Sequence, residues 1–100
     1  MLGQSVVVKV TADDIQHGVC ADKECCAVAI AIKRALEPLL GEVHAFVHRY
    51  MARVTMPGGT MFFMTIPEDI NLWIGKFDLG ETVEPIRFAS TITKDNPTCN

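Results

Sequence analysis

The sequence has no long apolar segment. Its longest apolar run, Cys25 to Ile32, has eight residues and ends at Lys33, whereas a helix that spans a bilayer needs about 20. The segment from Met1 to Val10 also lacks the basic start, apolar stretch and small-residue cleavage site of a secretory signal. We therefore expect a cytoplasmic protein that makes no contact with a membrane.

An excess of positive charge is missing as well. Nine Lys and Arg residues stand against twelve Asp and Glu residues, which gives a formal net charge of -3. Nucleic-acid binders usually carry a basic field, so nucleic acid is not the expected partner. Packing in the core is the expected role of most aromatic residues on the predicted strands, namely Phe46, Tyr50, Phe62 and Phe63.

Catalytic motifs are absent too. The chain has no Gly-rich phosphate loop, no G-x-S-x-G segment and no paired carboxylates at the end of a predicted strand. Cys25 lies near a predicted helix N-terminus, which lowers the pKa of a thiol, but its acidic neighbours Asp22 and Glu24 would raise that pKa. We therefore expect a protein that is not an enzyme and carries no cofactor, with a thiol enzyme as an alternative.

A C-x-x-C pair, the usual mark of a structural zinc site, is also missing. The side chains that zinc accepts do cluster in one stretch, and if a metal is bound its ligands are expected to be His17, Cys20, Cys25 and Cys26. The simpler interpretation is that Cys26 acts as a small, buried apolar residue. In a cytoplasmic protein the thiols are expected to stay reduced. A zinc-binding regulator therefore stays an alternative to a protein without metal.

The chain does have well-ordered apolar patterns. The near-continuous valines of residues 5–10 predict a central strand that is buried on both faces. Thr11 and Asp14 form a capping-box pattern that opens a helical turn, which Gly18 ends. A helix is expected from Lys23 to Leu36, with Asp22 as its N-cap. Its core face is expected to consist of Val28, Ile32, Ala35, Leu36 and Leu39.

The second half of the chain predicts a hairpin, a helix and a strand. Residues 42–56 read as one long strand, bent in the middle, and the turn at 57–59 leads into a return strand over 60–66. A helix follows from Pro67 to Gly80, and its apolar stripe comprises Ile70, Trp73, Ile74 and Phe77. A last strand is expected over 83–91.

This order of elements predicts an α+β domain of the ferredoxin-like βαββαβ type. Such a fold has a four-stranded antiparallel sheet with two helices on one face. We expect a single domain over residues 1–93 and a flexible tail over 94–100, because the polar residues of the tail offer nothing to bury. A domain of this size has a thin margin of stability, and a homodimer would increase that margin.

The predicted strand over 42–56 carries the most suggestive group of polar residues. Its basic side chains, with no acid among them, are His44, His48, Arg49 and Arg53. On one continuous strand the two histidines would share one face and the two arginines the other. We interpret them as a docking surface for an acidic partner or a phosphate-bearing ligand. The alternative is an edge strand whose charges block edge-to-edge pairing.

Several segments resemble small proteins that bacteriophages and prophages encode. The resemblance rests on VKVTADDIQHG (8–18), CAVAIAI (26–32) and FDLGETVEPIRF (77–88), and it departs from that pattern where Cys-Pro would be expected before Ala27. No established chemistry comes with this family. The resemblance implies an accessory viral protein that binds and modulates a host protein, with an inhibitor of host defence as the expected case. The alternative is a protein that sequesters a nucleotide-like signal.

Overall fold

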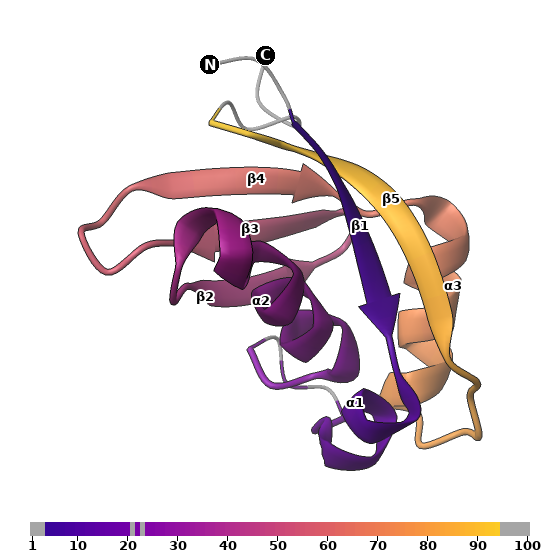
Figure 1. The fold of residues 1–100 in the computed structure, drawn as a ribbon. Helices are drawn as coiled ribbons and strands as arrows, with labels where there is room; N and C mark the ends of the chain where they lie inside the picture. The colour runs from indigo at the N-terminus through magenta and orange to yellow at the C-terminus, as the bar shows by residue number, and fades with distance from the viewer. Residues whose placement is uncertain (1–3, 21, 23, 95–100) are drawn as a thin grey trace.

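The computed structural model describes residues 4–20, 22 and 24–94. Within them the chain forms β1 (Gln4–Val10), α1 (Ala12–His17), α2 (Ala27–Leu40), β2 (His44–His48), β3 (Met51–Thr55), β4 (Met61–Thr65), α3 (Glu68–Asp78) and β5 (Ile86–Thr93) (Figure 1). The α+β class and the antiparallel pairing are confirmed. The tail predicted over 94–100 lies, from residue 95 onward, outside the described residues.

The strand order differs from the ferredoxin-like prediction. The described strands form one antiparallel sheet of five strands, in the order β1-β5-β4-β3-β2. The prediction of four strands was therefore wrong, and so was the topology, because the ferredoxin-like arrangement places the first strand inside the sheet. Here β1 lies at the edge and pairs only with β5.

The valines of β1 do not form a strand that is buried on both faces, as predicted. Val6, Val8 and Val10 are buried, whereas Val7 is 51% exposed on the opposite face. This alternation is typical of a strand with one face on the core and one in solvent. Valine is compatible with the outward position of Val7 because its preference for the extended backbone holds on either face of a strand.

The long strand predicted over 42–56 is two strands. A tight turn at Arg49 and Tyr50 joins β2 to β3, with His48 and Met51 as the flanking pair. Tyr50 has a φ of 64°, in the left-handed region that favours glycine. The turn reverses the chain, so residues that would lie on opposite faces of one strand come to share a face.

Strands β4 and β5 pair only at one end. Their register comprises Phe63 with Thr93 and Met64 with Ile92, and beyond that point β5 curves away together with β1 (Figure 1). Ser90, buried where they diverge, donates its hydroxyl to the carbonyl of Thr65 at 2.6 Å. The hydroxyl replaces a backbone hydrogen bond that the separated strands cannot make.

Helices α2 and α3 close the core. Helix α2 packs against β1 and β2. Helix α3 follows β4 and leads back to β5, and it buries the predicted residues Ile70, Trp73 and Phe77. The Trp73 and Phe77 rings stack with centroids 5.8 Å apart, and the Trp73 indole donates to the Glu84 carbonyl at 2.9 Å. The buried indole is therefore both packed and hydrogen-bonded.

Helix α2 begins four residues later than predicted, at Ala27. Its N-cap is Cys26 and not Asp22, since the Cys26 sulfur accepts from the Ala29 N–H at 3.4 Å. The helix continues past Leu36 to Leu40, and Leu39, predicted in the core, is 48% exposed. No helix within the described ranges combines the length and apolar character that crossing a bilayer requires.

Candidate functional site

The outward side of β2, β3 and β4 forms an open surface, which we call the meander face. Alternate residues of the three strands are buried, and the remaining ones define this face: His44, Phe46, His48, Met51, Arg53, Thr55, Met61, Phe63 and Thr65. None of them is acidic, although the chain as a whole has a net charge of -3. The face therefore combines apolar contact area with positive charge.

Arg53 lies at the centre of the meander face. Its cross-strand neighbours are Phe46 on β2 and Phe63 on β4. The guanidinium carbon lies 4.9 Å from the centroid of the Phe46 ring, a cation–π arrangement. The Arg53 Nε atom is buried without a hydrogen-bond partner, and no salt bridge of the described residues involves Arg53. A half-buried cation thus stands on this face without a compensating carboxylate.

The structure brings three of the four predicted docking residues together. His44, His48 and Arg53 share the meander face, whereas Arg49 lies in the turn and faces another site. His44 is also engaged at the sheet edge, since its Nδ1 lies 2.9 Å from a Glu24 carboxylate oxygen. Because β2 is an edge strand, protection of that edge remains a second role for these histidines.

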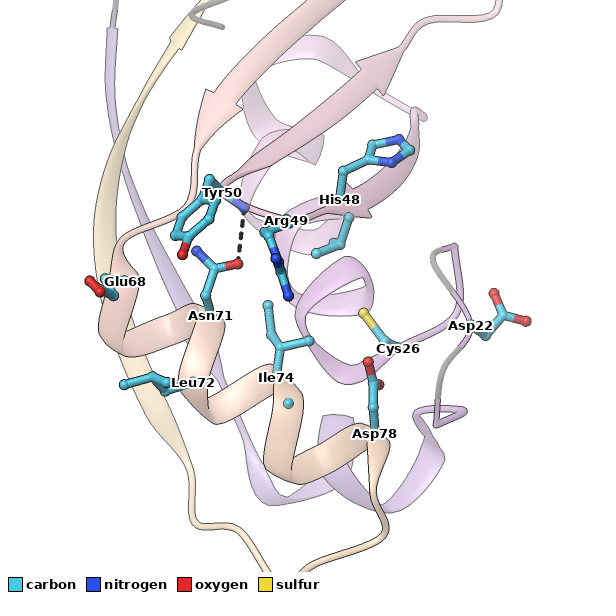
Figure 2. Close-up of a pocket in the computed structure, with 12 residues that line it drawn as sticks. Asp22, Cys26, His48, Arg49, Tyr50, Glu68, Asn71, Leu72, Ile74 and Asp78 are labelled. Atoms are coloured by element: carbon cyan, nitrogen blue, oxygen red, sulfur yellow. Dashed lines mark hydrogen bonds between the residues drawn. The ribbon is translucent and has the colours of Figure 1, made fainter.

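A cleft opens between α3, the β2–β3 turn and the start of α2, and we call it the α3 cleft (Figure 2). Its volume is about 650 Å³, within the usual range for ligand sites. It is lined by Asp22, Cys26, Val47, His48, Arg49, Tyr50, Glu68, Asn71, Leu72, Ile74, Gly75 and Asp78. Figure 2 shows the Arg49 side chain extending from the turn toward Ile74.

Asn71 holds the rim of this cleft in place. Its side-chain oxygen accepts from the Tyr50 N–H at 3.0 Å, and its amide nitrogen donates to the carbonyls of Ile66 and Pro67 at 3.1 and 3.2 Å. The Ile66 N–H in turn donates to the Tyr50 carbonyl at 2.9 Å. The role of Asn71 was not predicted from the sequence. The one indication was an asparagine within a predicted helix, where such side chains tend to form hydrogen bonds with the backbone.

Replacing Tyr50 by Gly is expected to change the free energy of unfolding by no more than about 0.5 kcal/mol. Glycine removes the strain of the left-handed backbone, and this gain offsets the entropy that glycine adds to the unfolded chain. Tyr50 is 48% exposed, so little packing is lost. Urea unfolding measures the effect, and Tyr50→Val, which adds β-branching at the same φ, is expected to cost more. A loss above about 1 kcal/mol for Tyr50→Gly would mean that the ring stabilises the fold.

The cysteines occupy two different environments. Cys26 is buried, as expected, and burial raises the pKa of its thiol, which keeps the sulfur protonated and unreactive at neutral pH. Cys20 and Cys25 are exposed free thiols. His17 is exposed, and its Nδ1 lies 2.8 Å from the Asp13 carbonyl. In the part of the chain that the structure describes, no three His, Cys, Asp or Glu side chains gather in a metal-binding group.

The two surfaces present different chemistry to a binding partner. The meander face presents Arg53 over the Phe46 ring with Phe63 as its neighbour on β4, and the α3 cleft combines apolar and charged residues in its lining. Such surfaces can supply apolar contact area for binding and charged groups that select among partners. No family model, curated protein or solved structure matches the chain.

Proposed function

We propose that this protein works by binding, without catalysis, and that its meander face docks onto an acidic surface of a protein partner. The observation that carries the proposal is Arg53, a cation laid on the Phe46 ring with no acid of the described residues paired to it. An arginine that lies over a ring in this way can still donate from its outer nitrogens to a carboxylate. In the setting that the phage resemblance implies, the partner is a host protein.

The composition of the meander face supports a protein partner over a nucleic acid. Arginine and aromatic residues dominate the energetics of protein interfaces, and the methionines Met51 and Met61 add adaptable apolar area. A nucleic acid needs many phosphate contacts, and this face offers one arginine and two histidines within a chain of net charge -3. One strong cation within an apolar surround fits a carboxylate on a folded partner better.

Reversing the charge of Arg53 is expected to disrupt partner binding. In affinity capture from a bacterial host extract, Arg53→Glu should weaken retention of the partner by at least about 30-fold, the size of an interface hot spot. Arg87→Glu is the matched control, because Arg87 is also an outward-facing strand arginine but is exposed and lies on β5. Thermal unfolding of both variants checks that the fold survives.

Equal retention by Arg53→Glu and the wild-type protein would remove the meander face from the interface. A thermal-shift panel of nucleotides separates the alternative function, because a ligand that binds the folded state raises its melting temperature. A nucleotide that stabilises the wild type and fails to stabilise Arg53→Glu would favour sequestration of a small signal over docking of a protein.

A further inference from the structure

The geometry points to a second binding site, in the α3 cleft, for a short peptide segment with an apolar side chain between basic ones. This inference goes beyond the proposed function, because it concerns a second surface that shares only His48 with the meander face and has the opposite preference in charge. It rests on three features of the cleft: free space above α3, a rim held in a strained conformation, and carboxylates at both ends.

Gly75 provides the space. It lies within α3, and a Cβ atom built on it meets no atom within 4 Å apart from the helix's own backbone and its chain neighbours. One turn earlier, Leu72 is 66% exposed and adds apolar surface beside this gap. Ile74 and Val47 add apolar surface to the lining. The floor of the cleft is thus suited to receive an apolar side chain.

Tyr50 places an aromatic side chain at the rim, on a backbone that hydrogen bonds hold in place. It keeps a bulky side chain at a φ of 64°, where glycine would be less strained. The hydrogen bond to Asn71, drawn in Figure 2, ties this strained turn to α3. Strain of this kind persists where the surrounding structure holds it, and it concentrates at binding sites. A tyrosine has only two side-chain torsions, so it supplies contact area for a ligand at a low cost in conformational entropy.

The charged residues that line the cleft favour a peptide with basic residues on either side of its apolar side chain. Glu68 lies at one end of the cleft, and Asp22 and Asp78 lie at the other (Figure 2). Two basic residues, Arg49 and His48, also belong to the lining, and Arg49 extends over the middle, where its N–H groups can donate to backbone carbonyls of a peptide. Lysine or arginine on either side of the anchor would face Glu68 at one end and the negative charge of Asp22 and Asp78 at the other, where the Asp22 carboxylate also accepts from the Glu24 and Cys25 N–H groups at 2.9 Å.

Selection from a displayed library of random linear peptides tests the inference. Against the wild-type chain we expect enrichment of sequences in which an apolar residue lies between lysines or arginines. Gly75→Gln places a side chain in the open space and should reduce the affinity of an enriched peptide at least about tenfold. Glutamine favours a helix more than glycine does, so the melting temperature should hold or rise.

A charge reversal supplies an independent measurement. Glu68→Lys should also weaken the enriched peptide at least about tenfold. Asp69→Lys, in the same first turn of α3 and outside the cleft lining, should not. Both variants disturb the helix dipole to a similar degree, so only the lining position distinguishes them. Enrichment of acidic peptides, absence of enrichment, or equal binding by the Gly75→Gln variant would overturn the proposed site.

The same variants separate the two proposals. Arg53→Glu changes the meander face and should leave the affinity for the enriched peptide within about twofold, since surface charges at a distance couple weakly. Gly75→Gln should leave capture of the acidic partner unchanged. Loss of peptide binding in the Arg53→Glu variant would show that the peptide occupies the meander face, which would overturn the cleft site and not the proposed function.

Discussion

Replacing Gly18 by Ala is expected to cost at least about 3 kcal/mol of stability, the upper end for overpacking a well-packed site. A Cβ atom at Gly18 would lie 2.6 Å from the backbone nitrogen of Ala27, 2.8 Å from the backbone carbonyl oxygen of Asp14 and 2.9 Å from the Phe77 ring. Two of these three atoms belong to the backbone, so a change of side-chain rotamer cannot relieve the clash. The residue lies where α1, the start of α2 and the end of α3 meet.

Urea unfolding and thermal unfolding measure this effect. For a domain of about 100 residues, a loss of 3 kcal/mol lowers the melting temperature by roughly 12 °C or more. Gly58→Ala is the matched control: a Cβ there meets nothing within 4 Å, and its φ lies outside the left-handed region. We expect that variant to stay within about 0.5 kcal/mol of the wild type. Similar losses in the two variants would contradict the steric argument.

The local elements of this fold could be predicted because short-range patterns determine them. The capping box is one case: the Asp14 N–H donates to the Thr11 hydroxyl at 3.2 Å, and the Thr11 N–H donates to the Asp14 carboxylate at 2.8 Å. The buried stripe of α3 is another, since Ile70, Trp73 and Phe77 recur at helical spacing. Both patterns lie within a few residues of sequence.

The turn at Arg49 and Tyr50 could not be predicted, because a distant residue stabilises it. No Gly, Asn, Asp or Pro marks the position, so residues 42–56 resemble one strand. The stabilising partner, Asn71, lies 21 positions further along the chain. The error matters for the sites, because this turn brings Arg53 to the face of His44 and His48 and leaves Arg49 in the α3 cleft.

The edge position of β1 was missed for a similar reason. Valine-rich strands favour burial, but which strand becomes central depends on the whole set of pairings. Here β5 pairs with both β1 and β4 and so takes the inner place. The last strand was expected over 83–91, whereas β5 runs over Ile86–Thr93, and its final residues are the ones that reach β4.

Asp14 joins three elements, and its replacement is the second substitution for which we expect a large loss of stability. The carboxylate is buried, at 3% exposure, and its two oxygens each accept from the Arg34 guanidinium at 2.7 Å. Arg34 also donates to the Lys9 carbonyl at 2.6 Å, which links the end of β1 to α1 and α2. Asp14→Asn should cost about 2 to 3 kcal/mol, less than for a fully buried pair because Arg34 is half exposed.

The same pair sets how stability depends on pH. The hydrogen bonds from Arg34 hold the pKa of Asp14 below its ordinary value. A carboxylate with a folded pKa below its unfolded one binds fewer protons in the folded state, so its contribution to stability is complete above about pH 5 and is lost as the pH falls further. We therefore expect the free energy of unfolding to decline between about pH 5 and pH 2 in the wild type.

Urea unfolding at several pH values separates Asp14 from the other carboxylates. Asp14→Asn should lower stability at pH 7 and flatten the acid decline, because the group that titrates is gone. Asp13→Asn removes the same charge from the adjacent, exposed position in the first turn of α1 and should leave both the stability and the slope close to the wild type. An Asp14→Asn variant with the acid profile of the wild type would mean that the pairing with Arg34 contributes no pH-dependent stability.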